Sequence, residues 1–226
     1  PGVPKYSETF FRSKINGLEQ NGNEVILFVK NPDQKSRINC KVVVHPNLKR
    51  NPILRLFQSF YYLLYSFSFA FNASIKLYQI ERSLGASTVG AIQAIIVASS
   101  ILPYKLDWLH FGFATTALQR ESIAKAVNAK MAVSIRGFDI SVVPLKSPNC
   151  YIKLWNSLDK LHTISDDLLE LAYLDGLKMS THVKKITPAI NAINFVFSEN
   201  KRHNRSTINF LTVGRLHWKK GFELVL

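Results

Sequence analysis

The residues of this sequence that could hold a phosphate group follow one another near its end. Residues 210–213 are apolar or β-prone and predict a short buried strand, which Gly214 ends. The cations Arg215 and Lys220 stand in the loop that follows, and residues 222–226 predict the first turn of a helix. Backbone N–H groups, the helix dipole and fixed positive charges converge in such an arrangement. The pattern therefore predicts a phosphate or diphosphate site, although a basic loop is also typical of a plain solvated surface.

Three further polar residues follow predicted strands. His110 stands near the end of a predicted strand at 107–112, and Arg136 and Asp139 follow another at 131–135. Open α/β sheets bind ligands at the carboxyl ends of their strands, so His110 is a candidate catalytic residue, but a lone histidine beside phenylalanines is also typical of a structural position. The planar fork of Arg136 suits a phosphate or a carboxylate. Asp139 is a candidate ligand for a sugar hydroxyl, or else it accepts hydrogen bonds from its own loop.

The elements that must position these residues alternate along the chain. Ser7 and Glu8 predict the start of a helix that Gly22 ends, and a continuous apolar run predicts a strand at 25–29. The strand that should precede this helix would lie before Pro1, and the chain is expected to be a fragment cut at both ends. Further strands are predicted at 42–45, 107–112, 131–135 and 183–187, and further helices at 86–100 and 115–129. Residues 161–170 predict a strand that runs into a helix, which Ser165 begins and Gly176 ends. This alternation favours a Rossmann-like, doubly wound parallel sheet of the α/β class.

A long aromatic segment predicts helical structure between residues 51 and 83. Its apolar residues recur at steps of three and four, which places them on one helix face: Ile53, Phe57, Phe60, Leu64, Phe67 and Phe71. That face could be core, or it could contact a membrane with support from Lys49, Arg50 and Arg55. The uncharged runs at 56–75 and 83–104 are long, but they carry too many polar residues to predict membrane spans.

The charge and cysteine content of the sequence limit the classes of partner that the protein could bind. The 226 residues carry a formal net charge of +14, which favours polyanions such as phosphorylated substrates, an anionic membrane or nucleic acid. Lysine and arginine are scattered, and no nucleic-acid-binding pattern occurs, so we expect no nucleic-acid partner. Cys40 and Cys150 lie far apart and outside any metal-ligand spacing, which favours free thiols in the cytoplasm and no metal site.

Four segments resemble, in order, those of family-4 (group 1) glycosyltransferases with the GT-B fold, of the colanic-acid and exopolysaccharide type. Val213-Gly-Arg-Leu-His-Trp-Lys-Lys-Gly221 resembles the segment that opens the second domain of these enzymes. Pro4-Lys-Tyr-Ser-Glu-Thr-Phe10 resembles their first cleft loop, and residues 107–112 and 134–141 resemble two strand ends of their first domain. Arg136 stands where many members carry histidine, so the role of that histidine is not carried over.

The resemblance implies an enzyme that moves a sugar from a nucleotide diphosphate-sugar to a saccharide or lipid-linked acceptor, with retention and without a metal or other cofactor. It assigns the donor diphosphate to Gly214, Arg215 and Lys220, and a place in the cleft to Ser7, Glu8 and Thr9. Residues 1–199 would form the acceptor domain, 200–206 a linker and 207–226 the start of the donor domain. This fragment alone would be inactive.

The implied setting is surface-polysaccharide assembly in the cytoplasm, with peripheral contact to the inner, anionic face of the cell membrane. Two alternatives stay open at this point. Both make the chain non-catalytic: a basic protein of the membrane surface, or a nucleic-acid-binding protein.

Overall fold

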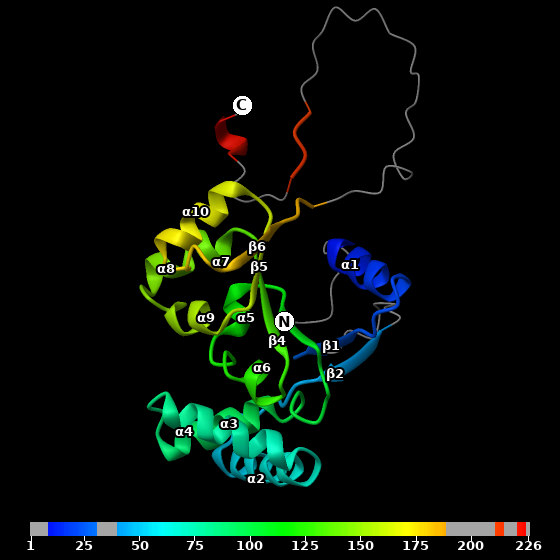
Figure 1. Ribbon diagram of the computed structural model, residues 1–226, viewed down its shortest axis with the longest axis vertical. Helices are drawn as coiled ribbons and strands as arrows, with labels where there is room; N and C mark the ends of the chain where they lie inside the picture. The colour runs from blue at the N-terminus through cyan, green and yellow to red at the C-terminus, as the bar shows by residue number, and fades with distance from the viewer. Residues whose placement is uncertain (1–8, 31–39, 189–210, 215–220, 225–226) are drawn as a thin grey trace, which may run out of the picture. The chain divides into compact units, whose positions relative to one another are not determined.

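A computed structural model of the chain describes residues 9–30, 40–188, 211–214 and 221–224 (Figure 1). The chain divides into two compact units, residues 1–190 and 191–226, which are described separately. The first unit holds all the sheets of the described residues, and its strands and helices alternate. The protein is therefore of the mixed α/β class.

Parallel strands form both sheets of the first unit. The larger sheet has four strands in the order β3-β4-β5-β6, and the smaller sheet pairs β1 with β2. Every one of these pairings is parallel, which confirms the predicted parallel α/β class. The strand bounds agree with the predicted runs to within about two residues. They are β1 (Ile26–Val29), β2 (Lys41–Val44), β3 (Trp108–Phe111), β4 (Lys130–Ile135), β5 (Lys160–Thr163) and β6 (His182–Lys185).

Helices connect successive strands of the larger sheet, as parallel pairing requires. The helix predicted at 115–129 is wrong, because the structure has two short helices there, α5 and α6. Gln119 lies between them with a φ of 63°, a left-handed conformation that ends a helix. The helices are α1 (Thr9–Gln20), α2 (Pro52–Phe69), α3 (Phe71–Ser83), α4 (Thr88–Ala98), α5 (Ala114–Ala117), α6 (Ile123–Ala126), α7 (Phe138–Ser141), α8 (Val143–Lys146), α9 (Ile152–Ser157) and α10 (Asp166–Leu174).

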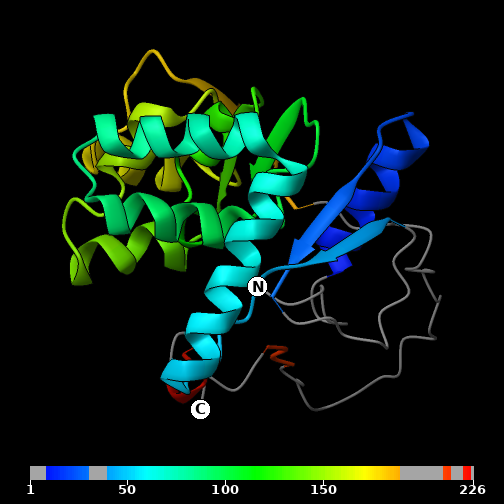
Figure 2. The ribbon, with the colours of Figure 1, turned by 90° about the horizontal axis from the view of Figure 1, so that it is seen from below.

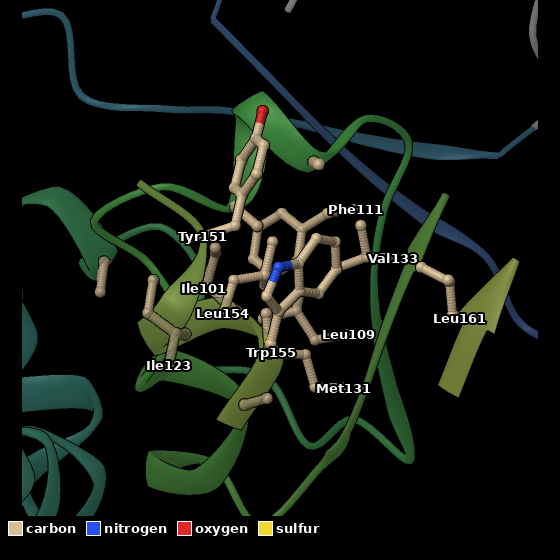
Figure 3. Close-up of a cluster of buried hydrophobic side chains, with 14 of the residues drawn as sticks. Ile101, Leu109, Phe111, Ile123, Met131, Val133, Tyr151, Leu154, Trp155 and Leu161 are labelled. Atoms are coloured by element: carbon tan, nitrogen blue, oxygen red, sulfur yellow. The ribbon is translucent and has the colours of Figure 1, made fainter. Parts of the chain in front are cut away.

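The core of the first unit lies between β3–β5 and the helices that connect these strands (Figure 3). Side chains of alternate strand residues, such as Leu109, Val133 and Leu161, point into it and are almost fully buried. Tyr151 and Trp155 fill its centre, with ring centroids 5.5 Å apart. Burial of these apolar side chains leaves the alternate residues of each strand on the opposite face of the sheet. That opposite face carries the candidate site.

The aromatic segment forms two helices, α2 and α3, that meet at Ala70. The backbone of Ala70 leaves the helical region, with φ −149° and ψ 43°, and the buried Ser74 hydroxyl donates to the Ser66 carbonyl across the break. The first turns of α2 extend away from α3 and α4 (Figure 2). Phe57 is 68% exposed and Phe60 is 60% exposed, so of the two interpretations the one in which this whole face is core is wrong. Only the last turns of α2, including Phe67, pack against the core.

The second unit is described at residues 211–214 and 221–224. The strand predicted at 210–213 is wrong where it can be assessed, because residues 211–213 have no regular secondary structure. Leu211 and Val213 are 88% and 86% exposed. A strand is held by hydrogen bonds to a neighbouring strand, and the described residues of this unit contain none to pair with. Phe222–Leu224 form a 3₁₀ turn, η4, which takes the place of the expected first turn of an α-helix.

None of the helices in the described part of the chain combines the length and apolarity needed to cross a bilayer.

Candidate functional site

One face of the larger sheet carries a polar residue on each of three neighbouring strands. His110 lies in the carboxyl half of β3, Ser134 in that of β4 and His162 in that of β5. Ser134 is paired with His162, and His110 is paired with Ala132, two residues before Ser134. Side chains two residues apart share a face of a strand, so all three project to the face opposite the core.

A continuous chain of hydrogen bonds links these side chains to α1. The Lys14 ammonium lies 3.1 Å from His110 Nδ1 and 3.4 Å from His110 Nε2. His110 Nε2 lies 2.8 Å from Ser134 Oγ, which lies 2.8 Å from His162 Nδ1. His162 Nε2 lies 3.1 Å from the carbonyl oxygen of Ile186. Four side chains from α1 and three strands thus form one connected cluster, called here the histidine relay (Lys14, His110, Ser134 and His162).

The last acceptor of the histidine relay determines where its protons lie. The Ile186 carbonyl can only accept, so His162 carries its hydrogen on Nε2 and accepts at Nδ1 from the Ser134 hydroxyl. The Ser134 oxygen then accepts from His110 Nε2–H. The lone pair of His110 Nδ1 is left to accept from Lys14. Each hydrogen bond in the chain from the Ile186 carbonyl to His110 Nδ1 therefore has a donor and an acceptor when both histidines are neutral. The 3.4 Å approach of Lys14 to His110 Nε2 brings two donors together and is not one of these bonds.

The electrostatic surroundings keep both histidines neutral. Desolvation lowers the pKa of His110 to about 3, and the charges of Lys14, His162 and Arg136 act in the same direction. His110 still exposes surface to solvent, so the direction of this shift, rather than its size, is the property the site uses. Desolvation, followed by the charges of Lys14 and Arg136, also lowers the pKa of His162, although its bond to Ile186 opposes the shift. The same effects lower the pKa of Lys14 to about 8, with Arg136 as the neighbouring cation. The cluster is rich in nitrogen bases and cations, and the carboxylate of Asp139 faces the neighbouring Arg136.

Arg136 lies directly after β4, beside the histidine relay. Its Nε donates to the carbonyl oxygen of Gly112 at 3.3 Å, which ties the loop after β4 to the loop after β3. The guanidinium stacks over Phe11 of α1, 5.0 Å from the ring centroid, and lies 5.9 Å from that of Phe113. The structure thus brings Arg136 and His110, both predicted as site residues, to the same edge of the sheet.

Asp139 is buried and takes part in the backbone framework of the site. Its Oδ1 accepts from the amide of Arg136 at 3.0 Å, and its Oδ2 accepts from the amide of Ala114 at 3.2 Å. Its own carbonyl accepts from the Tyr151 hydroxyl at 2.8 Å. Of the two sequence interpretations, this geometry favours the loop-bonding one, because both carboxylate oxygens already accept from backbone amides.

The other predicted site residues lie mostly outside the described residues. Ser7, Glu8, Arg215 and Lys220 are among these. Thr9 is the first residue of α1, and Gly214 lies in an exposed bend of the second unit. The predicted diphosphate site therefore stays a prediction. Within the described ranges, no three metal-ligating side chains gather in one place.

Comparisons of the chain with models of protein families, with curated proteins and with solved structures find no match. The functional interpretation of the site therefore depends on its own geometry and on the motif resemblance.

Sequence reasoning missed three of the four members of the histidine relay: Lys14, Ser134 and His162. Ser134 and His162 could have been found from the sequence, because each of them, like His110, is a polar residue near the end of an apolar strand. Aligning the three strand ends would have grouped them. No sequence signal points to Lys14, which lies 96 residues from His110 and reaches it only through the packing of α1.

Proposed function

We propose that this chain is the acceptor-binding part of a GT-B glycosyltransferase resembling family 4, with a Rossmann-like, doubly wound first domain. The substrates would be a nucleotide diphosphate-sugar and a saccharide or lipid-linked acceptor used in surface-polysaccharide assembly. The observation that carries this proposal is the gathering of His110 and Arg136 at the carboxyl ends of neighbouring parallel strands, where α/β folds bind ligands. The ordered motif resemblance supplies the reaction class.

The reaction breaks the bond between the anomeric carbon and the diphosphate oxygen. The oxygen of an acceptor hydroxyl bonds to that carbon, its proton passes to the departing diphosphate oxygen, and the nucleoside diphosphate leaves. His110, exposed near the end of β3, and Arg136, directly after β4, bind and position the acceptor. Asp139 acts as a positioning residue through the amides of Arg136 and Ala114. Gly214, Arg215 and Lys220 would hold the diphosphate, as the resemblance implies.

Binding of each substrate class tests the proposal on the chain itself. Calorimetric titration with a panel of nucleotide diphosphate-sugars, and with short lipid-linked saccharides in detergent, should show saturable binding of at least one acceptor. The Arg136→Gln and His110→Ala variants should bind it about tenfold more weakly. Lys178→Gln, a change in an exposed turn, is the matched control and should bind normally. Equal binding by all variants, or none by the folded wild type, would remove His110 and Arg136 from an acceptor site.

A second property of the proposed enzyme is peripheral binding to an anionic membrane surface on the inner side of the cell. The exposed apolar face of α2 favours it, since Leu56 and Phe57 are 70% and 68% exposed next to the exposed cations Arg50 and Arg55. A helix with an aromatic face and flanking cations suits the boundary between headgroups and acyl chains. The alternative function, a non-catalytic membrane-surface protein, rests on this same face and would keep vesicle binding while lacking substrate binding.

A further inference from the structure

Lys14 and Arg136 place two cations around one neutral imidazole at the exposed end of the larger sheet. Lys14 contacts His110 from α1, and Arg136, bonded from the loop after β4 to the Gly112 carbonyl, adds a second positive charge that acts on His110. The titratable groups that face His110 are Lys14, Arg136 and His162, and the carboxylate of Asp139 faces Arg136. Both oxygens of that carboxylate accept backbone amides, so it sits in the framework below the cations.

The hydrogen bonds of the histidine relay leave a single position where a proton can be added to His110. Nε2 already carries a hydrogen toward Ser134, so only Nδ1, the ring nitrogen nearer to Lys14, can accept one. A proton at Nδ1 would turn the Lys14 contact from an attraction into the repulsion of two cations. An oxyanion that contacts both groups from the solvent side would accept a hydrogen bond from each and offset that repulsion.

We propose that Lys14, His110 and Arg136 form a binding site for a phosphate-type oxyanion, and that His110 takes up one proton from solvent when the oxyanion binds. Ser134 and His162 act as positioning residues that hold His110 with its Nδ1 toward the anion. Oxyanion binding at this site does not depend on glycosyl transfer, so this proposal can hold even if the transferase proposal is wrong. Its natural ligand is a phosphate group on a lipid or on a soluble nucleotide.

Sulfate is the sharpest first probe, because it stays a dianion between pH 6 and pH 8. Any proton taken up on binding therefore belongs to the protein. Calorimetric titration of the chain with sodium sulfate in two buffers of different ionisation heat measures that uptake. We expect a net proton uptake at pH 6, where Lys14, with a pKa of about 8, is already protonated and the proton therefore goes to His110. We also expect binding to tighten as the pH falls from 8 to 6. Binding without proton uptake, or no binding, overturns the proposal.

The histidine ring signals locate the site without relying on a variant that folds poorly. In the wild-type chain, the Cε1–H resonance of His110 should shift on addition of sulfate and titrate at a higher pH than in its absence. Lys14→Met should weaken sulfate binding about tenfold, as expected for the loss of a charge-assisted hydrogen bond. Lys178→Gln should bind sulfate as the wild type does. An unmoved His110 signal, or equal losses in both variants, contradicts the site.

The source of the phosphate group is distinguished by three further titrations, with inorganic pyrophosphate, with a nucleoside diphosphate and with vesicles containing a phosphorylated lipid. Preference for the vesicles, lost in Lys14→Met, assigns the site to a lipid-linked substrate. Preference for the nucleotide, lost in the same variant, assigns it to the soluble donor. If none of the three binds in a manner that depends on Lys14, the proposal of a phosphate site is wrong. Sulfate and phosphate binding without any saccharide binding would remove the transferase proposal alone.

Discussion

At the scale of single residues, the site depends on a neutral His110 whose protons are fixed by its neighbours. His162 and Ser134 fix the tautomer from one side, and Lys14 occupies Nδ1 from the other. The same positive surroundings that keep the imidazole neutral also make the site receptive to negative charge. The effect of one cation, Lys14, on the pKa of His110 can therefore be tested.

Replacing Lys14 should raise the pKa of His110. Lys14→Met removes the nearest cation, so the pKa should move from about 3 toward the ordinary histidine value of 6.5. Desolvation is the larger cause of the shift, and it stays in place, so the recovery should be partial. A pH titration of the Cε1–H resonance by NMR measures this. Lys178→Gln is the control, and a His110 pKa that falls in Lys14→Met would show that the cation does not act as described.

Acid should destabilise the fold below pH 6.5 through histidines whose pKa is lowered in the folded chain, and His45 and His110 are the two to test by substitution. The pKa of His45 is lowered to about 4 and that of His110 to about 3, so between these values and 6.5 the unfolded chain binds more protons than the folded one. The free energy of unfolding must then rise with pH across this window and level off above it. Urea unfolding at pH 5 and pH 7 should show the difference. The double variant His45→Gln, His110→Gln should have a smaller slope, and an unchanged slope would contradict the assigned directions.

The buried carboxylate of Asp139 should matter for folding stability. Asp139→Asn replaces one of its two accepting oxygens with an N–H donor, so one backbone amide, of Arg136 or of Ala114, loses its partner. The expected cost is about 1–3 kcal/mol in the free energy of unfolding. Asp107→Asn changes an exposed aspartate in the same way and should alter stability by less than about 0.5 kcal/mol. Similar values for the two variants, from urea unfolding, would mean that Asp139 is not the buried acceptor described.

At the scale of elements, apolar runs and cap residues predicted most strands and several helix ends. The strand at Lys130–Ile135 was predicted at 131–135, and the helix that follows Ser165 begins where the sequence indicates, with its hydroxyl accepting from the Leu168 amide. The break between α5 and α6 was missed, because alanine-rich residues favour helix and the left-handed Gln119 has no local sequence signal. The short α8 and α9 were missed because they lack long periodic patterns.

The aromatic segment shows why periodicity alone could not place its apolar face. The spacing correctly indicates a helix with one apolar side, but it cannot distinguish a side that meets the core from one that meets a membrane. The structure decides between them by position, since the first turns of α2 extend past α3 and α4 (Figure 2). That position makes the apolar face available to a membrane.

Two phenylalanines of α2 should account for much of the binding to anionic vesicles. Phe57→Ser with Phe60→Ser removes apolar area at positions that are already exposed, so folding should be little affected. Co-sedimentation with vesicles containing an anionic lipid should fall at least about tenfold, since each inserted side chain contributes about 1.5–3 kcal/mol. The double change Leu145→Ser, Leu174→Ser removes equally exposed residues elsewhere and should bind normally. Equal binding by both double variants would exclude α2 as the contact.

At the scale of the whole first unit, the site exists only because α1 packs against the end of β3. A side chain at Gly112 would lie 2.9 Å from the Phe11 ring, so the close approach of α1 requires a glycine there. That contact brings Lys14 to His110 across 96 residues of sequence. Contacts of this range follow from tertiary packing, and this is why the sequence could indicate His110 and Arg136 but not Lys14.

Gly112→Ala should therefore displace α1 and detach Lys14 from the histidine relay. The overlap with Phe11 should cost about 1–3 kcal/mol of stability, and it should shift the His110 Cε1–H resonance as Lys14→Met does. Gly17→Ala is the control within the same helix, because its added methyl group would meet nothing and should be neutral or stabilising by up to about 1 kcal/mol. Thermal unfolding and NMR spectra of both variants measure the two effects. A normal His110 signal in Gly112→Ala would show that α1 does not set the position of Lys14.

Transfer of a labelled sugar tests the central claim most directly. Membranes from cells that make the protein from its native gene would be incubated with a panel of radiolabelled nucleotide diphosphate-sugars, and label in the lipid fraction would be counted. We expect one donor to label lipid, the labelling to disappear when the gene is deleted, and wild-type or Lys178→Gln protein to restore it while His110→Ala does not. Equal labelling with and without the gene, for every donor, would contradict the assignment as a glycosyltransferase.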